Sequence, residues 1–323
     1  MRLMALSSSL AGICAFLCAL LLPGVQPVTA ARSSGPNPFA GRTLYVDPNS
    51  DAAQTQQQWA AQGRTADAAT IGKIASHSQA IWFGGGSTGD VDRWVSKAAA
   101  AGAMPVLVAY DLSGSECDGL SQGSAGAYKT FINGMAQGIK GRRAVVILEP
   151  DALAQLGCLS PAGQNLAYSL LRYAVRRLGS APRVSVYLDA GHARWHPAAV
   201  MAVRLRRAGV ARARGFSVNV ASFDRTSSEM AYGSAIARRL GIRTHFVIDT
   251  SRNGRGPAPG AAWCNPPGRG LGPAPTAKTG NPLVDAFVWI KRPGESDGHC
   301  NGGPGEGTWW ADYALALARN AAF

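Results

Sequence analysis

Residues 144–151, Ala-Val-Val-Ile-Leu-Glu-Pro-Asp, contain the pattern that decides the fold of this chain. Five apolar residues are followed at once by two carboxylic acids that flank a proline. A short, uninterrupted apolar run of this kind predicts a strand that is buried on both faces, as in a parallel sheet. We therefore expect a strand over 144–150 whose carboxyl end presents acidic side chains.

Similar apolar runs recur along the chain and alternate with amphipathic stretches such as 162–178 and 227–240, which predict helices. The candidate strands are 43–46, 81–84, 104–110, 144–150, 184–190, 215–222, 243–249 and 286–291. Strands that alternate with helices form a parallel sheet covered on both faces. Eight such units predict one α/β domain, a (β/α) barrel that is irregular or incomplete.

Polar side chains stand at the carboxyl ends of these candidate strands. The residues at these ends are Tyr110, Asp151, Asp189, Asp249 and Lys291. The strand ends of a barrel meet at one face, where active sites are built, so we expect these groups to converge. Helix capping is the alternative for Asp151, because a helix-like Ala-Leu-Ala-Gln-Leu follows it. Capping does not account for the whole set.

The first 30 residues have the composition of a signal peptide. Arg2 provides a positive charge, the run 10–22 is apolar, and Val28-Thr29-Ala30 offers a cleavage site. We expect export, with the protein secreted or associated with the cell envelope, then a short tether over 31–42 and a catalytic domain over 43–323. No later stretch approaches 18 uninterrupted apolar residues, so the mature chain is expected to have no membrane span.

Charge and cysteine content limit the other function classes. The formal net charge is +13, with arginine clusters at 172–177 and 204–214. Both clusters lie on helix-like stretches, where a solvated face is expected rather than a nucleic-acid site. Four cysteines remain after the signal peptide: Cys117, Cys158, Cys264 and Cys300. They favour two disulfides, with three connectivities open, and the absence of a C-x-x-C pair argues against zinc.

The strand-end carboxylates and the tryptophans together favour hydrolysis of glycosidic bonds. This reaction needs a protonated acid at the leaving oxygen and a second carboxylate, and aromatic rings bind the apolar faces of sugars. Trp82 lies in a candidate strand, Trp195 follows Asp189 by six residues, and Trp263 lies in the Gly- and Pro-rich loop 251–282. A single tryptophan is more often a core residue, and Trp263 is the best candidate for a sugar platform.

Four motifs resemble those of glycoside hydrolase family 6, the inverting cellulases, over the chain from about Pro36 to its end. They are Val-Ile-Leu-Glu-Pro-Asp-Ala-Leu at 146–153, Tyr-Leu-Asp-Ala-Gly-His-Ala-Arg-Trp at 187–195, Trp-Cys-Asn at 263–265 and Trp-Ile-Lys-Arg-Pro-Gly-Glu-Ser-Asp-Gly at 289–298. The resemblance implies a distorted, partly open barrel of about seven parallel strands. It also implies an inverting endo-β-1,4-glucanase that acts on cellulose-like glucans without metal or cofactor, and we expect a monomer.

The resemblance also implies roles for individual residues. Asp151 matches the general acid, Asp297 the proposed base, Asp189 a supporting acid, and Tyr110 the tyrosine that distorts the reacting sugar. The positions that match sugar contacts are Trp82, His192, Trp195, Trp263, Lys291 and Glu295. The disulfides implied by the family are Cys117–Cys158 and Cys264–Cys300. His192 and His196 have the i, i+4 spacing of a metal pair on a helix, but Pro197 follows, so no metal is expected.

The sequence departs from the family pattern at several positions. The usual Arg-Asp-Cys is Ser115-Glu116-Cys117, Gln122 aligns with an expected serine, and Ser222 replaces a sugar-contacting asparagine. If Glu116 raises the pKa of Asp151, its extra methylene predicts measurable but slow hydrolysis. An exported glucan-binding protein with weak or lost hydrolysis is the alternative function, and the retention of Asp151 and Asp297 favours the enzyme.

Overall fold

The computed structural model describes residues 35–85, 87–112, 122–241 and 244–323, and they contain a seven-stranded parallel sheet. The strands are β1 (Ile81–Gly84), β2 (Val106–Tyr110), β3 (Ala144–Leu148), β4 (Val184–Asp189), β5 (Gly215–Val218), β6 (His245–Asp249) and β7 (Val284–Val288). They pair in chain order, each parallel to the next. This arrangement confirms the α/β fold class and the family-based expectation of seven strands.

One of the eight predicted strands does not form: the prediction of a strand over 43–46 is wrong. Of this stretch, Leu44 makes an isolated parallel bridge with Met104. The reason lies in the register of β1, in which Ile81 pairs with Leu107. Because β1 occupies the edge of β2 beyond Met104, the earlier segment cannot extend its ladder.

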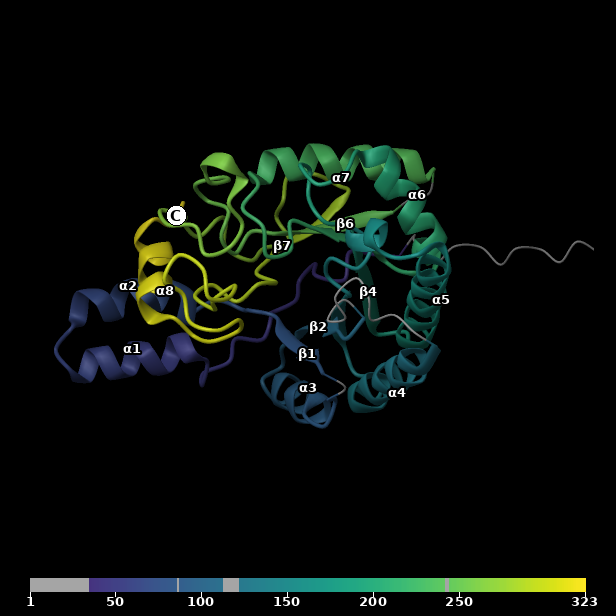
Figure 1. The fold of residues 1–323 in the computed structure, drawn as a ribbon. Helices are drawn as coiled ribbons and strands as arrows, with labels where there is room; N and C mark the ends of the chain where they lie inside the picture. The colour runs from purple at the N-terminus through teal and green to yellow at the C-terminus, as the bar shows by residue number, and fades with distance from the viewer. Residues whose placement is uncertain (1–34, 86, 113–121, 242–243) are drawn as a thin grey trace, which may run out of the picture. The chain divides into compact units, whose positions relative to one another are not determined.

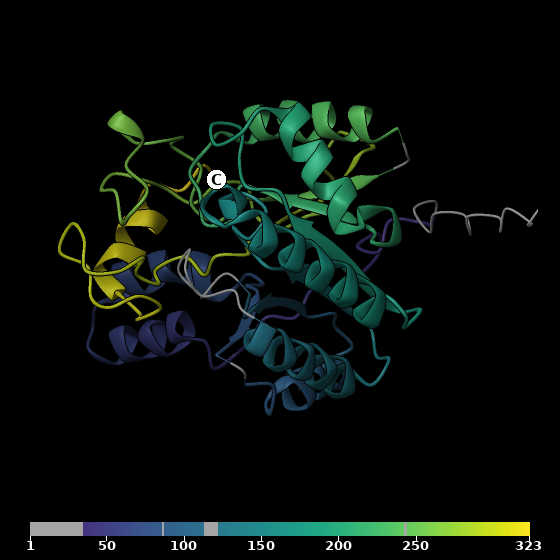
Figure 2. The same ribbon diagram turned by 45° about the vertical axis from the view of Figure 1, so that its right-hand side comes forward.

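The sheet curls until its first and last strands approach each other (Figures 1 and 2). The backbone N–H of Ala80 donates to the carbonyl of Trp289 at 2.9 Å, and the indole of Trp82 donates to the carbonyl of Ile290 at 2.8 Å. No ladder joins β1 to β7 in the described part of the chain. The result is a curled half-barrel, partly open between its edge strands.

Five helices cover the outer face of the sheet and pack against their neighbours in order (Figure 1). They are α3 (Val91–Ala100), α4 (Gln122–Ile139), α5 (Pro161–Leu178), α6 (Ala198–Ala208) and α7 (Thr226–Leu240). The predicted helices 162–178 and 227–240 are thereby confirmed. Side chains alternate across each strand. In β2, Leu107 and Ala109 pack outward in the core that contains the helices, whereas Val106 and Val108 fill the inside of the barrel.

A second apolar cluster joins α1 (Asp51–Ala61), α2 (Thr65–Ala75) and α8 (Ala311–Arg319) to Trp289, which follows β7 directly. The remaining elements are three short 3₁₀ segments, η1 (Gln155–Cys158), η2 (Val210–Arg212) and η3 (Pro259–Ala261). The long loop predicted between the last two strands is confirmed, since η3 is the one regular element described in it. None of the helices among the described residues combines the length and hydrophobicity that crossing a membrane would require.

Candidate active site

The carboxyl ends of β3 and β5 leave the sheet through unusual backbone conformations. Glu149 and Asp151 have φ angles of 51° and 71°, and Asn219 and Ala221 have φ angles of 68° and 56°. Non-glycine residues rarely adopt positive φ, and such residues cluster where a structure holds functional groups in place. The carboxyl end of the sheet therefore carries strain after two strands, β3 and β5, which flank β4.

Asp151 does not cap the helix that follows it, so the capping alternative is wrong. The side chain of Ser160 caps α5 instead, accepting from the N–H of Gly163 at 3.1 Å. Asp151 lies nine residues earlier, in a turn where its carbonyl accepts from the N–H of Gln155 at 2.8 Å. Its carboxyl group is free to take part in chemistry.

Asp151 and Asp189 form a closely coupled pair. The carboxylate of Asp189 accepts from the backbone N–H groups of Asp151 at 3.0 Å and Gly191 at 2.9 Å, and from the hydroxyl of Ser217 at 3.1 Å. Burial raises the pKa of Asp151 to about 6. Burial, and then the neighbouring charge of Asp151, raise the pKa of Asp189 to about 7. Both groups therefore keep their protons up to a much higher pH than an ordinary aspartate, to about pH 6 for Asp151 and about pH 7 for Asp189.

Glu149 is a buried acid to which the sequence analysis assigned no role. Its side chain accepts from the backbone N–H groups of Asp111 at 3.0 Å and Leu112 at 2.8 Å. It is 1% exposed, and burial raises its pKa to about 8. A glutamate that directly ends a fully apolar strand was the available signal. Glu149 holds the turn after β2 against the end of β3.

Tyr110 and Trp82 form an aromatic corner beside the acid pair. Their rings meet edge to face, with centroids 5.4 Å apart. Burial raises the pKa of Tyr110 to about 12, and the charges of Asp151 and then Glu306 add to the effect. Glu306 also raises the pKa of Asp151, so the loop before α8 approaches the acid. Sequence reasoning missed Glu306, which stands in no motif.

The loop after β4 carries His192 and Trp195. Their rings lie 5.4 Å apart, and Trp195 is 37% exposed. The Nδ1 atom of His192 lies 2.8 Å from Asp224, whose other oxygen contacts the guanidinium of Arg194. Asp224 is 2% exposed and was also missed, because it is distant in sequence from the histidine that it holds.

His192, Asp224 and Glu229 form the one group of potential metal ligands found among the described residues, with ligand atoms within 4.8 Å of one another. His192 and His196 do not face each other as a metal-binding pair would, because the Nε2 atom of His196 lies 2.7 Å from the carbonyl of Ala154. Arg194 already occupies the carboxylate of Asp224. Arg194 therefore supplies the positive charge beside Asp224, and Glu229 accepts from the backbone N–H of Ala193 at 2.9 Å.

Asp297 lies in the loop after β7 and has the opposite electrostatic environment. Both its oxygens accept from Nη1 of Arg252, at 2.9 and 2.8 Å, and the amine of Lys291 is 3.5 Å away. Burial alone would raise its pKa, but the positive charges of Arg252 and Lys291 outweigh burial and hold the pKa below its usual value. Asp297 therefore stays ionised where Asp151 is protonated.

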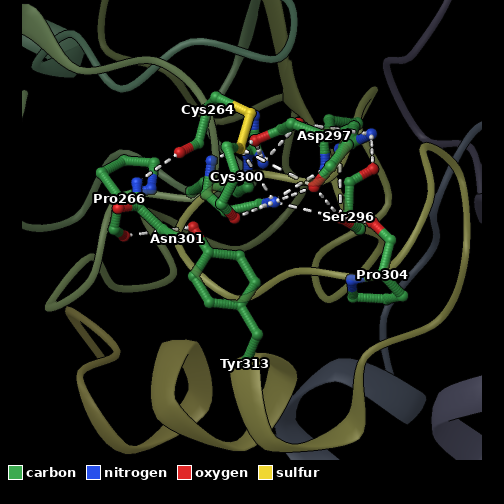
Figure 3. Close-up of a disulfide and its surroundings, with 12 residues drawn as sticks. Cys264, Pro266, Ser296, Asp297, Cys300, Asn301, Pro304 and Tyr313 are labelled. Carbon is green, nitrogen blue, oxygen red and sulfur yellow. Dashed lines mark hydrogen bonds and ion pairs between the residues drawn. A yellow bond between two sulfur atoms is a disulfide. The ribbon is translucent and has the colours of Figure 1, made fainter.

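Asn265 fixes the position of Asp297 through a reciprocal pair of hydrogen bonds, beside the disulfide of Cys264 and Cys300 that Figure 3 shows next to Asp297. The backbone N–H of Asn265 donates to Asp297 at 3.0 Å, and the backbone N–H of Asp297 donates to the Asn265 side chain at 2.8 Å. The disulfide between Cys264 and Cys300, with Cα atoms 6.1 Å apart, joins the same two loops. This implied disulfide is confirmed, and it lies directly beside the candidate base.

The other predicted sugar contacts surround this second carboxylate. Lys291 and Glu295 are 8% and 5% exposed, and burial lowers the pKa of the amine and raises that of the acid. Trp82 connects the two halves of the site, since its indole donates to Ile290, next to Lys291. Trp263 is 69% exposed, as a platform for a sugar ring would be.

Several predicted features lie outside the described residues. Ser115, Glu116 and Cys117 are among them, so the Cys117–Cys158 pairing and the place of Glu116 stay predictions, as does the side chain of Gln122. Ser222 is described, and it stands partly exposed directly after the strained Ala221. It lies at the carboxyl end of β5, between the two carboxylate groups in chain order.

Comparison with known proteins extends these observations. Endoglucanase A of Cellulomonas fimi is 43% identical over 293 residues, which cover 88% of this chain and 62% of that protein. Endoglucanase 1 of Streptomyces halstedii is 40% identical over 312 residues, covering 93% of this chain and 94% of that protein. The chain spans less than two thirds of the first of these relatives.

Solved structures show the same fold. An endoglucanase from Mycobacterium tuberculosis, solved with methyl-cellobiosyl-4-deoxy-4-thio-beta-D-cellobioside, superposes with a TM-score of 0.81 at 43% identity. The match covers 88% of this chain and 99% of that one. The family model described as "Glycosyl hydrolases family 6" matches residues 39–321. The chain therefore belongs to glycosyl hydrolases family 6.

Proposed function

We propose that this protein is a secreted, inverting endo-β-1,4-glucanase that hydrolyses cellulose-like chains, with Asp151 as general acid and Asp297 as candidate base. One observation carries the proposal. Two carboxyl groups at the same end of the barrel have pKa values shifted in opposite directions, up to about 6 for Asp151 and below the usual value for Asp297. Acid and base roles are divided in this way when two environments separate the pKa values of a pair.

The proposed reaction uses these protonation states directly. Asp151 donates its proton to the glycosidic oxygen as the bond to the anomeric carbon breaks, and a water attacks that carbon from the opposite face. The water gives up its proton toward Asp297, which is ionised. Asp189 keeps the backbone of Asp151 in place through a 3.0 Å hydrogen bond. Trp195 and Trp263, both exposed, are the platforms on which the sugar rings would lie.

Cleavage within chains is supported by the loop after Asp297. Gly298 and His299 alone separate Asp297 from the disulfide at Cys300, which is too short a segment to roof the site. Both sequence relatives described above, at 43% and 40% identity, are named endoglucanases. Residues 1–30 as a signal peptide, and hence secretion, remain part of the proposal.

Hydrolysis of soluble carboxymethyl cellulose by the purified protein is the first test, with reducing ends and viscosity measured together. We expect viscosity to fall early for each bond cut. Proton NMR of the first product should show the α-anomer, as inversion requires. Binding without release of reducing ends would instead support the glucan-binding alternative, and a β-anomer formed first would refute inversion.

A further inference from the structure

A cavity of about 390 Å³ opens at the amino-terminal ends of β3, β4 and β5, the opposite end of the sheet from Asp151. Its charged lining residues are all arginines, namely Arg42, Arg143, Arg183, Arg212 and Arg214. Among the described residues, no aspartate or glutamate lines this cavity. It is a concentrated positive surface that the proposed glucan site does not use.

The strand register forces two of these arginines together. Ala144 of β3 pairs with Val184 of β4, so the preceding residues, Arg143 and Arg183, are also neighbours. The N–H of Ala144 donates to the carbonyl of Arg183 at 3.3 Å. Adjacent strands lie about 4.8 Å apart, and like charges placed side by side on them are destabilising. Neither guanidinium has an ion pair to another described residue, and Arg183 is exposed to solvent.

Arg214, in the same cavity, is the one of these arginines whose charge is neutralised by a carboxylate of the described chain. Its Nε and Nη2 atoms donate to Asp285, each at 2.8 Å, and its Nη1 atom donates to the carbonyl of Gly35 at 2.6 Å. Arg42 and Arg212, by contrast, are exposed and have no ion pair to another described residue. Four of the five guanidinium groups are therefore available to an anion.

The lining also indicates which anion fits. Guanidinium groups bind phosphate oxygens through parallel hydrogen bonds, and several of them along a cavity suit repeated charges. No aromatic side chain lines the cavity in the described chain, so it offers no stacking surface for nucleobases or sugar rings. We propose that this arginine-lined cavity binds a ring-free polymer of phosphates, of the polyphosphate type.

Binding at this end would leave the opposite, carboxyl end of the strands open. The protein could therefore be retained on a phosphate-bearing surface while its candidate active site stays accessible to a polysaccharide. This inference does not depend on the proposed hydrolysis, because the cavity shares no residue with that site.

The test is a titration of the purified protein with long-chain inorganic polyphosphate at about 0.15 M salt, where weak surface attraction is largely screened. We expect Arg143→Gln/Arg183→Gln to weaken binding at least about tenfold, because charge-assisted hydrogen bonds are lost. The matched control is Arg176→Gln/Arg238→Gln, which removes the same charge from exposed positions on α5 and α7. Its affinity should change less than about threefold. Thermal melting of each variant checks folding.

Three further results would decide the matter. Equal losses in the two double variants would mean that the net charge of +13 alone attracts the polymer, which would overturn the proposal. Orthophosphate binding as tightly as polyphosphate would exclude a polymer. Tighter binding of single-stranded DNA, lost with Arg143 and Arg183, would assign the cavity to nucleic acid instead.

Discussion

Two regions at the carboxyl end of the barrel bury the same chemical group with opposite results. One region, the carboxyl region, contains Asp151, Asp189, Glu149 and Glu229, and burial raises every one of their pKa values. The other, the cation region, contains Asp297 together with the cations Arg252 and Lys291, and the pKa of Asp297 is lowered. Burial opposes ionisation in both regions.

The difference between the regions is the partner that each carboxylate receives. Asp297 has a fully buried guanidinium bound to both its oxygens. Asp189 instead accepts from backbone N–H groups and a hydroxyl, and another acid stands beside it. Neutral donors offset desolvation only in part at Asp189, whereas the positive charges of Arg252, 2.8 Å away, and of Lys291 together outweigh it at Asp297. A carboxylate alone does not define an acid or a base, and its neighbours do.

The largest expected effect comes from removing the acid of the carboxyl region. Asp151→Ala should reduce the rate on cellulose-like substrates by about 10²–10⁴-fold, because general acid catalysis typically contributes this much. The loss should be much smaller with a dinitrophenyl cellooligosaccharide, whose leaving group needs no proton. Initial rates on both substrates provide the measurement. Equal losses on the two would remove Asp151 from the acid role.

The second prediction concerns the removal of Arg252, the main cation beside Asp297 in the cation region. Arg252→Met should let the pKa of Asp297 rise, so that the acid limb of the kcat/KM profile moves to higher pH and the rate at acidic pH falls about tenfold. Arg252→Lys keeps a positive charge and should move the limb less. Because Arg252 is fully buried, melting curves must accompany the pH profiles. Three identical profiles would show that Arg252 does not control Asp297 in catalysis.

The third prediction concerns the stability of the carboxyl region. Glu229 has a folded pKa of about 8 against 4.5 for the free side chain, because it is buried. Its folded state binds the proton more tightly, so its contribution is complete below pH 4.5 and is lost as pH rises through 8. Between these values the free energy of unfolding should fall by at most about 1.4 kcal/mol per pH unit from this group.

Glu229→Gln keeps an acceptor for the N–H of Ala193 and cannot ionise, so it should flatten this fall. Denaturant unfolding of both proteins at pH 5 and pH 8 measures the difference. Asp189 and Glu149 also have raised pKa values and remain in both proteins, so the difference between the proteins measures Glu229 together with its interaction with Asp189. A stability gap between the two proteins that does not change with pH would contradict the prediction.

The smallest expected effect comes from Glu306, an exposed acid that raises the pKa of Asp151. Glu306→Gln should lower that pKa and move the alkaline limb of the activity profile down by a few tenths of a pH unit, and less so at high salt. Asp312→Asn, which removes an equally exposed acid from α8, is the control. A shift of the same size in the control would mean that the effect reflects net charge alone.

The fold was predictable from the chain because its signal is local and repeated. Runs such as 144–148 are apolar throughout, and this is possible in water because helices cover the outer face of the strand and other strands' side chains cover its inner face. The one false strand, 43–46, is Thr-Leu-Tyr-Val, whose residue types also favour strands. This segment does not form a strand because β1, whose Ile81 pairs with Leu107, already occupies that edge of β2. Competition between two segments for one edge is not encoded in either segment.

The candidate site divides in the same way. Local patterns predicted polar groups at the strand ends, and the four motifs implied the roles of Asp151, Asp189 and Asp297. Their protonation could not be predicted from local sequence, because it depends on contacts that the fold makes. Arg252 lies 45 residues before Asp297, and Asp224 lies 32 residues after His192, yet each pair is in contact at 2.8 Å. Electrostatic energy depends on distance in space and on burial, and the folding of the barrel creates both.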